Sequence, residues 1–378
     1  MIYKSLLFPI YSFYPHHGGG PSLSVYWLAK ALVKKGFEVT VITSTNGLDG
    51  KYPPNQWNKI DGIKVQYCSN KIRLIRLSIQ NIRETDVIHL TSVCYLPSLI
   101  IAIWSCLFSK KPIIWSPRGE LAKEAISGNR IKQVLFNLYG KLFYKRIVFH
   151  GTSDKEIEEI KQRLGCRNTI KLPNYLDLSP KYDLPQGRYL LYLGRLSPIK
   201  SLDKLFDALS LSKSFLESDY KLLLAGKAVI AEEVACENQL RSQIMKLGIE
   251  DKIQFLGEVG GVDKDKLLSK AYFSFLVSET ENFGNVVVEA MAQGTPVVTS
   301  LGTPWGVLSD KNVGYHISNE PAILAKTIDE IMTLTDEEYK ELRRRVFDFC
   351  VHEFSIDDNI QKWIAVYNNM LNNCKIVK

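Results

Sequence analysis

The chain has 378 residues, of which 46% are hydrophobic and 23% are charged. This length and composition exclude a disordered chain and predict two or three domains with substantial cores. Residues 1–180 carry 25 Lys and Arg against 12 Asp and Glu, a net charge of +13, whereas residues 181–378 carry 23 against 28. A basic half favours a polyanionic partner, either nucleic acid or an anionic membrane, although it can also serve solubility alone.

Targeting signals and paired cysteines are not evident. Residues 1–9 lack the pattern of a secretory signal, and the longest apolar stretch, residues 96–108, is shorter than the roughly 20 residues that span a bilayer. The seven cysteines are odd in number and never form a C-x-x-C pair, which argues against a disulfide framework and a zinc site. We therefore expect a cytoplasmic protein with reduced cysteines and no zinc site.

Apolar runs alternate with amphipathic stretches along the N-terminal half. Residues 5–10 form a first apolar run, and residues 23–35 have helical spacing. Further β-branched runs, typical of buried parallel strands, follow at residues 38–43, 87–90 and 112–115. This rhythm predicts a doubly wound α/β domain.

A stretch rich in Pro and Asp, residues 172–187, predicts a linker between two similar lobes. The strand pattern then restarts, with apolar runs at residues 189–193, 222–225, 253–256, 273–277 and 296–299. We expect one lobe at residues 1–178 and another at 179–355. An amphipathic helix is expected from about residue 356 to 372, and its pattern does not decide on which lobe it packs.

The first candidate site is the loop HHGGGP at residues 16–21, ahead of a helix expected to start near Ser22. Glycines at a helix N-terminus let backbone N–H groups approach an anion, so Gly19 and Gly20 are candidates for a phosphate cradle. A flexible turn would have the same sequence. His16 and His17 do not indicate a metal, because adjacent side chains rarely converge on one ion.

The second candidate is the segment GRLSPIK at residues 194–200, which follows the strand at 189–193. Gly194, Arg195 and Lys200 would lie at the carboxyl end of a strand, where open α/β sheets bind ligands. Two cations there suit a diphosphate and could hold a leaving group without a divalent metal. Surface salt bridging is the alternative.

The strongest motif is SETENFGNVVVEAMAQGTPVV at residues 278–298. Glu281 and Glu289 are eight positions apart, and residues 283–285 indicate a helix start between them. The buried side of that helix is expected to be formed by Val286, Val287 and Ala290. A carboxylate on such a helix needs a partner, and a ribose diol would be one; a solvent-facing pair of glutamates is the alternative.

Two weaker signals remain. Asp263-Lys264-Asp265 matches a D-x-D pattern that can hold manganese, but its context is typical of a turn and helix N-cap. Residues 130–147 are basic, aromatic and free of acids. Such a helix can lie on an anionic leaflet, or it can be a core helix with solvated lysines.

These motifs together resemble the family-four retaining glycosyltransferases of GT-B fold. The resemblance rests on the Gly-rich first loop, Gly194-Arg195 with Lys200, LLAG at 223–226, FLG at 255–257, and Glu281 and Glu289 followed by GTPV at 294–297. It implies two Rossmann-like doubly wound parallel-sheet domains facing a central cleft. The N-terminal domain would bind the acceptor, with the C-terminal helix at about 356–378 packed on it, and residues 179–355 would bind the nucleotide sugar.

The resemblance also implies roles for individual residues. Gly19 and Gly20 would contact the distal phosphate or the donor sugar. Arg195 and Lys200 would contact the diphosphate, Glu281 the donor hexose, and Glu289 the ribose hydroxyls. Backbone N–H groups near the sugar and phosphate would come from Asn282, Phe283, Gly284 and Asn285. Family members transfer with retention and without a metal, by front-face attack in which the departing phosphate takes the acceptor's proton, so no protein nucleophile is assigned.

The sequence departs from the family pattern after the strand at residues 112–115. Many relatives carry a donor-facing His there, whereas here Arg118 takes that position. An Arg could bind a hydroxyl, a phosphate or an acidic sugar. His89 and His150 lie near predicted strand ends, and we expect a core role, particularly for His150.

The resulting hypothesis is a retaining transferase for a hexosyl or N-acetylhexosaminyl unit, with a UDP-sugar favoured as donor and GDP-mannose next. The acceptor would be an undecaprenyl-diphosphate-linked glycan in O-antigen (lipopolysaccharide), capsule or exopolysaccharide synthesis, at the inner face of the cell membrane. The alternatives are a soluble transferase acting on a small acceptor and a non-catalytic nucleotide-sugar-binding protein. Nucleic acid is not expected as a partner, because no groove-entering motif or aromatic platform is evident.

Overall fold

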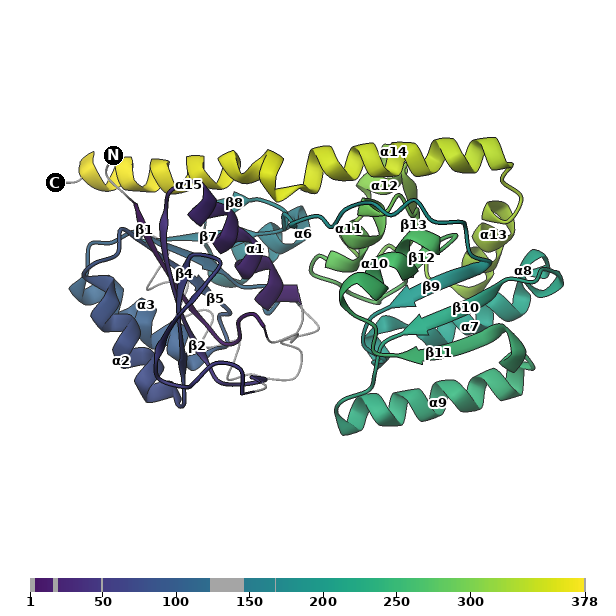
Figure 1. Ribbon diagram of the computed structural model, residues 1–378, viewed down its shortest axis with the longest axis horizontal. Helices are drawn as coiled ribbons and strands as arrows, with labels where there is room; N and C mark the ends of the chain where they lie inside the picture. The colour runs from purple at the N-terminus through teal and green to yellow at the C-terminus, as the bar shows by residue number, and fades with distance from the viewer. Residues whose placement is uncertain (1–3, 16–19, 49, 123–145, 167, 377–378) are drawn as a thin grey trace. The chain divides into compact units, whose positions relative to one another are not determined.

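The computed structural model describes residues 4–15, 20–48, 50–122, 146–166 and 168–376, with side chains up to residue 372 (Figure 1). The chain divides into two compact units, unit 1 with residues 1–177 and 356–378 and unit 2 with residues 178–355. The backbone N–H of Ile356 donates to the carbonyl of Leu176 at 2.9 Å, so the chain leaves unit 1 and returns to it at neighbouring points.

The described part of unit 1 contains one sheet with the strand order β3-β4-β2-β1-β5-β6-β7-β8. Its strands are β1 (Ser5–Ile10), β2 (Glu38–Ser44), β3 (Trp57–Ile60), β4 (Ile63–Cys68), β5 (Val87–Thr91), β6 (Ile113–Ser116), β7 (Ile147–Gly151) and β8 (Thr169–Lys171). The predicted strands are present and parallel. The antiparallel pair β3 and β4 was not predicted, because its short strands lack a continuous apolar run.

Helices cover both faces of this sheet (Figure 1). They are α1 (Gly20–Lys34), α2 (Lys71–Ile82), α3 (Leu96–Phe108), α6 (Asp154–Leu164) and α15 (Ile356–Ile376). Successive side chains of β1 point to opposite faces of the sheet. Leu6 and Phe8 pack in the hydrophobic core with α1 and α15, and Leu7 packs in the core on the other face with α2 and α3. Burial on both faces explains why the strand is apolar throughout.

Two segments of unit 1 differ from the predictions. Helix α1 starts at Gly20, two residues before the expected start at Ser22. Of the helix expected over residues 130–147, residues 130–145 lie outside the described part of the chain, and the prediction was wrong for Ile147, which is the first residue of β7. Ile147 is in a strand because it pairs with Ile113 of the neighbouring strand β6.

Unit 2, which is described throughout, contains a parallel sheet in the order β11-β10-β9-β12-β13-β14. Its strands are β9 (Tyr189–Leu193), β10 (Lys221–Ala225), β11 (Ile253–Gly257), β12 (Ser274–Leu276), β13 (Val297–Ser300) and β14 (Gly314–Ile317). Its helical segments are η1 (Pro198–Lys200), α7 (Leu202–Leu211), α8 (Lys213–Glu217), α9 (Ala231–Leu247), η2 (Glu250–Lys252), α10 (Gly261–Lys270), α11 (Asn285–Ala292), α12 (Val307–Asp310), α13 (Pro321–Ile331) and α14 (Asp336–Phe354). The five predicted strands are confirmed, and β14 is additional.

Helix α14 was not predicted. It begins with a capping box in which Thr335 accepts from the backbone N–H of Glu338 and the Glu338 carboxylate accepts from the backbone N–H of Thr335. Its surface is mostly charged, and its buried stripe is narrow. Because few apolar residues recur at helical spacing in this segment, the sequence pattern did not indicate a helix, and only α15 was expected at the C-terminus.

A buried chain of hydrogen bonds joins three strands of unit 1 to α15. His150 Nε2 lies 2.9 Å from the carbonyl oxygen of Leu172, and its Nδ1 lies 2.8 Å from Ser116 Oγ. His89 bridges Ser116 Oγ and the Tyr367 hydroxyl at 2.9 Å on each side. Because a carbonyl can only accept, His150 donates through Nε2, Ser116 donates to His150, His89 donates to Ser116, and Tyr367 donates to His89.

This network needs both imidazoles to be neutral. Burial lowers the pKa of His150 to about 3, with a further contribution from the charge of Arg118. Burial also holds the pKa of His89 well below its usual value, together with His150 and Arg118. Both histidines are therefore satisfied core residues, as was expected mainly for His150.

The network predicts a pH-dependent stability. An unfolded chain protonates His150 below pH 6.5, whereas the folded chain does so only near pH 3, so the free energy of unfolding falls as the pH drops through this window. Each histidine contributes up to about 1.4 kcal/mol per pH unit. In thermal unfolding from pH 7 to pH 5, His150→Gln should be less stable at pH 7 and should lose less stability on acidification.

The control is Met245→Gln, because this side chain does not titrate and is 73% exposed on α9. Its unfolding should have the same pH dependence as the unchanged chain. An equal pH dependence in His150→Gln and the unchanged chain would contradict the neutral-network assignment.

Candidate functional site

The predicted site residues of unit 2 gather where the strand order reverses. Strand β9 connects onward to β10 on one side, whereas its neighbour on the other side is β12. The loops after β9 and β12 therefore leave the sheet next to each other in opposite directions. Such a switch point is the usual ligand position in an open α/β sheet.

The loop after β9 is held by close backbone contacts. The buried Tyr192 hydroxyl donates to the carbonyl of Arg195 at 2.6 Å, and the N–H of Gly194 donates to the carbonyl of Ala225 at 2.9 Å. A Cβ on Gly226 would lie 1.8 Å from the carbonyl oxygen of Gly194, so only glycine permits this approach. The loop is fixed independently of any ligand.

Arg195 points outward from this loop and pairs with a buried carboxylate. Its Nη1 lies 3.1 Å from Glu233 Oε1, with the Arg195 side chain 69% exposed and that of Glu233 only 3%. Burial by itself raises the pKa of Glu233, but the backbone N–H groups of Val229 and Ile230 and the charge of Arg195 outweigh it and lower that pKa. Sequence reasoning missed Glu233, although an acid in the first turn of α9 is a recognisable capping signal.

Lys200 and Glu281 form an ion pair across the switch point. Both side chains are mostly buried, and they come from segments 81 residues apart. The motifs predicted both residues but not their contact. Between these segments, the backbone N–H of Glu279 donates to the carbonyl of Ile199 at 2.9 Å.

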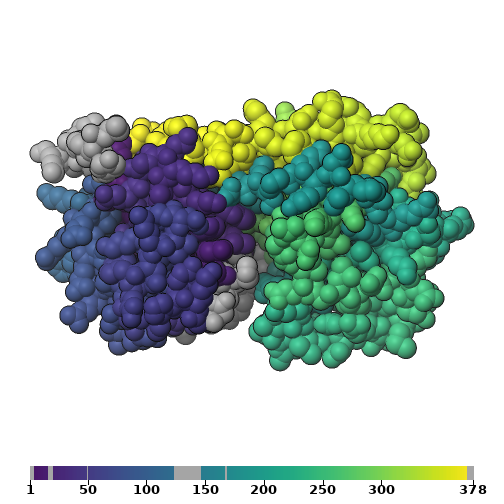
Figure 2. Space-filling view, in the orientation of Figure 1, coloured from purple at the N-terminus to yellow at the C-terminus, as the bar shows by residue number. Residues whose placement is uncertain are grey.

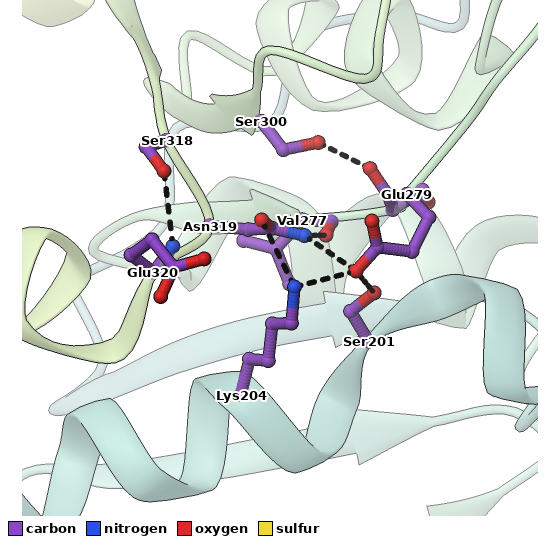
Figure 3. A network of polar contacts seen from close by, with 9 residues as sticks. Ser201, Lys204, Val277, Glu279, Ser300, Ser318, Asn319 and Glu320 are labelled. Atoms are coloured by element: carbon purple, nitrogen blue, oxygen red, sulfur yellow. Dashed lines mark hydrogen bonds and ion pairs between the residues drawn. The ribbon is translucent and has the colours of Figure 1, made fainter.

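A polar network beside this ion pair holds the two loops that carry it in fixed positions relative to each other (Figure 3). The Oε1 atom of Glu279 accepts hydrogen bonds from Ser201 Oγ and Asn319 Nδ2, each at 3.1 Å, and lies 2.7 Å from Lys204 Nζ. Lys204 is the main cause of the lowered pKa of Glu279. Ser201 follows Lys200 and Glu279 precedes Glu281 by two residues, so the network aligns the two loops. The sequence did not reveal it.

Glu289 lies in α11 and is also paired. Lys264 Nζ of α10 lies 2.9 Å from Glu289 Oε1, and both side chains are mostly buried. A ribose was expected as the partner of this carboxylate. In the structure its partner is Lys264 of the same chain. Lys264 belongs to the D-x-D segment, which lies near the N-terminal end of α10, and Gly260 is the N-cap of this helix.

The buried side of α11 differs in part from the prediction. Val287 and Ala290 are buried as expected, but Val286 is half-buried, and Val288 is buried instead. The prediction for Val286 was wrong because the helix phase is set by packing against α14 and not by apolar composition alone.

The start of α11 has a conformation that requires glycine. Gly284 is its N-cap with φ +82°, and a Cβ there would lie 2.6 Å from Leu276 Cδ2. The ring of Phe283 packs against Trp305 at 5.1 Å between centroids, so this side chain belongs to the core. Asn285 begins the helix, and the N–H of Val287 donates to the carbonyl of Gly284 at 3.0 Å. Asn282 lies in the loop before it.

In unit 1, Arg118 lies in the turn after β6 with φ +60°, and Gly19 lies outside the described residues. Arg118 Nη1 donates to Asn174 Oδ1 at 2.7 Å, and Nε is buried without a hydrogen-bond partner among the described residues. Burial lowers the pKa of this guanidinium. The next residue donates its N–H to Glu156 at 2.8 Å, and Glu120 accepts the N–H of Cys94 at 2.8 Å. Neither carboxylate was predicted.

Other features bear on the sequence-based expectations. Within the described residues, no group of three or more His, Cys, Asp or Glu side chains could hold a metal ion. No helix in the described ranges is long and apolar enough to cross a membrane. The six cysteines with described side chains are free thiols.

Known proteins are similar in sequence to this chain, over part of it or over most of it. Residues 176–347 match the family model of glycosyl transferases group 1. A mannosylfructose-phosphate synthase from Agrobacterium fabrum is 36% identical over 40% of this chain and 30% of its own length. A GDP-mannose:cellobiosyl-diphosphopolyprenol alpha-mannosyltransferase from Komagataeibacter xylinus is 24% identical over 82% of this chain and 79% of its own length.

Solved structures show the same fold. The structure of Anabaena HepE in complex with UDP and glucose superposes with a TM-score of 0.76 over 97% of this chain and all of HepE, at 21% identity. The GT-B fold expected from the motifs is confirmed. Residues 176–347, which include most of unit 2, are thus similar to the group 1 glycosyl transferases.

Proposed function

We propose that the chain is a retaining glycosyltransferase that moves a hexosyl or N-acetylhexosaminyl unit from a nucleotide-diphosphate sugar to a lipid-linked glycan. The observation that carries this proposal is the pairing of Lys200 with Glu281 at the switch point of unit 2, beside Arg195. A cation and a carboxylate held side by side suit a donor whose diphosphate adjoins a polyhydroxylated sugar.

The division of roles follows from charge and position. Arg195 and Lys200 would bind the diphosphate and stabilise the charge that develops on the leaving phosphate. Glu281 would accept hydrogen bonds from sugar hydroxyls, and Glu289 from the ribose. Backbone N–H groups at the start of α11 would add further donors.

We further propose that transfer proceeds without a metal ion and with retention. Two fixed cations can serve the leaving group as a divalent ion would. In front-face attack the departing phosphate oxygen takes the acceptor's proton, so no side chain is assigned as nucleophile. Arg118 would bind an anionic or hydroxyl group of a substrate, with its Nε as a hydrogen-bond donor that has no partner among the described residues.

The donor that we favour carries UDP. Support comes from the fold shared with HepE, which was solved with UDP and glucose. GDP-mannose is the second candidate, because the relative from Komagataeibacter xylinus is named for that donor.

The acceptor that we favour is a glycan on an undecaprenyl diphosphate, in O-antigen, capsule or exopolysaccharide synthesis. The same relative is named for a diphosphopolyprenol acceptor, and the net charge of +13 in residues 1–180 suits the cytoplasmic face of an anionic membrane. A small acceptor is the alternative, supported by the shorter match to a mannosylfructose-phosphate synthase.

A thermal-shift screen tests the donor. The chain would be unfolded with UDP, GDP, dTDP and CMP and their sugar conjugates, each with and without EDTA. A nucleotide at a hundredfold excess over its dissociation constant stabilises the native state by about 2.7 kcal/mol. We expect stabilisation by UDP compounds regardless of EDTA. Stabilisation that EDTA abolishes would contradict metal independence, and no shift with any nucleotide would contradict the proposed donor class.

Glu289→Ala should weaken UDP binding by at least about tenfold in calorimetric titration, because the ribose loses a charged acceptor. Lys264→Ala is the matched control, since it breaks the same ion pair but keeps the carboxylate. It should weaken UDP binding much less. Equal losses in the two variants would mean that the ion pair, and not the ribose contact, determines affinity.

Arg195→Ala should weaken UDP binding by about tenfold, with little change in melting temperature, because Glu233 keeps its backbone N–H donors. Arg188→Ala is the control, because this arginine lies at the other end of β9, is 70% exposed and pairs with Asp219. UDP affinity should be unchanged in the control. Full UDP affinity in Arg195→Ala would assign Arg195 a structural role.

A further inference from the structure

Helix α3 leaves large apolar side chains in solvent. Leu107 and Phe108 are 69% and 71% exposed, and Leu96 and Ile103 are also exposed. Positions 96, 103 and 107 recur at intervals of seven and four residues, so they line one side of the helix. The opposite side, with Ile101 and Ala102, is buried in the core of unit 1. The exposed side is therefore an apolar stripe without a partner among the described residues.

Basic residues surround the C-terminal end of this stripe. A hollow of about 550 Å³ is lined by Ile82, Arg83, Trp104, Phe108, Ser109, Lys110 and Lys111. It combines two aromatic rings with three cations. Arg146 also lies at this end, where its guanidinium donates to the carbonyl of Ser109 at 2.8 Å.

The neighbouring helix α2 extends the basic surface. Helices α2 and α3 pack side by side (Figure 1), and both belong to the blue surface of unit 1 in Figure 2. Lys71, Arg73 and Arg76 of α2 are exposed, and neither helix contains an Asp or Glu. The acids that follow α2 are Glu84 and Asp86, and the carboxylate of Asp86 accepts the N–H of Ser5 at 2.9 Å.

We propose that this α2–α3 face docks on an anionic lipid bilayer, with the apolar stripe among the lipids and the basic residues at the headgroup phosphates. The inference deepens the proposed function, since it rests on a lipid-linked acceptor. A helix of 13 residues is about 20 Å long, too short to span a bilayer and suited to lie in its interface.

Charge distinguishes a bilayer from a second copy of the chain. A two-fold interface would place the same patch against itself, so Lys110, Lys111 and Arg83 would meet like charges. An anionic bilayer supplies the opposite charge over the whole face. Large apolar side chains ringed by cations match that surface.

Vesicle flotation tests the docking face. The unchanged chain should float with vesicles of phosphatidylcholine and phosphatidylglycerol, and less with phosphatidylcholine alone or at high salt. The variants are Leu107→Gln with Phe108→Gln, and Lys110→Glu with Lys111→Glu. Each pair should lower partitioning by at least about tenfold. The controls in unit 2 are Met245→Gln, at a side chain that is 73% exposed on α9, and Lys326→Glu on α13.

UDP stabilisation measured on every variant separates docking from folding and donor binding. Lost flotation with unchanged UDP stabilisation, and normal flotation of the controls, would support the docking face. If the variants at residues 107, 108, 110 and 111 float as well as the unchanged chain, the α2–α3 face is not the docking surface, although the chain still associates with membranes. No flotation of the unchanged chain would overturn both the face and the proposed membrane location, whereas the glycosyltransferase assignment depends on the UDP result.

Discussion

The site in unit 2 depends on ion pairs that compensate the charge of mostly buried carboxylates. Removing an ionised carboxylate from water is costly unless it is paired and hydrogen-bonded. Glu281, Glu289 and Glu233 each meet this condition through a cation from a different element, as Lys200, Lys264 and Arg195 show. Three charge pairs therefore converge around the carboxyl ends of the strands. A donor that carries both anionic and hydroxyl groups can be recognised by such alternating charges.

The loops around these pairs are held by groups that do not touch the proposed ligand. Tyr192, Gly226 and Gly284 fix the backbone of the two loops, and Glu279 ties them together. A loop positioned in this way loses little conformational freedom when a ligand arrives. Preorganisation of this kind is what a transferase needs to act on charge that develops during the reaction.

Unit 1 uses polar groups differently. Its buried histidines remain neutral and pass hydrogen bonds in one direction, from Tyr367 through His89, Ser116 and His150 to a backbone carbonyl. The network fixes α15 on this unit, whereas the exposed face of α2 and α3 is basic and apolar. One side of the sheet thus anchors the returning C-terminal helix, and the other presents a surface suited to an anionic partner.

The sequence by itself determined the parallel strands, the two-lobed α/β fold and the positions of the candidate site residues at strand ends, because apolar periodicity and glycine position are local properties. Only the tertiary structure decided which charges meet, since Lys200 reaches Glu281 across 81 residues through the adjacency of β9 and β12. Lys264 was visible in a motif, but its partner Glu289 followed from the packing of α10 on α11. Helix α14 was not predicted because its buried stripe is narrow, and β14 because its four residues are only half-buried. Local pattern specifies elements, whereas strand order and packing specify partners.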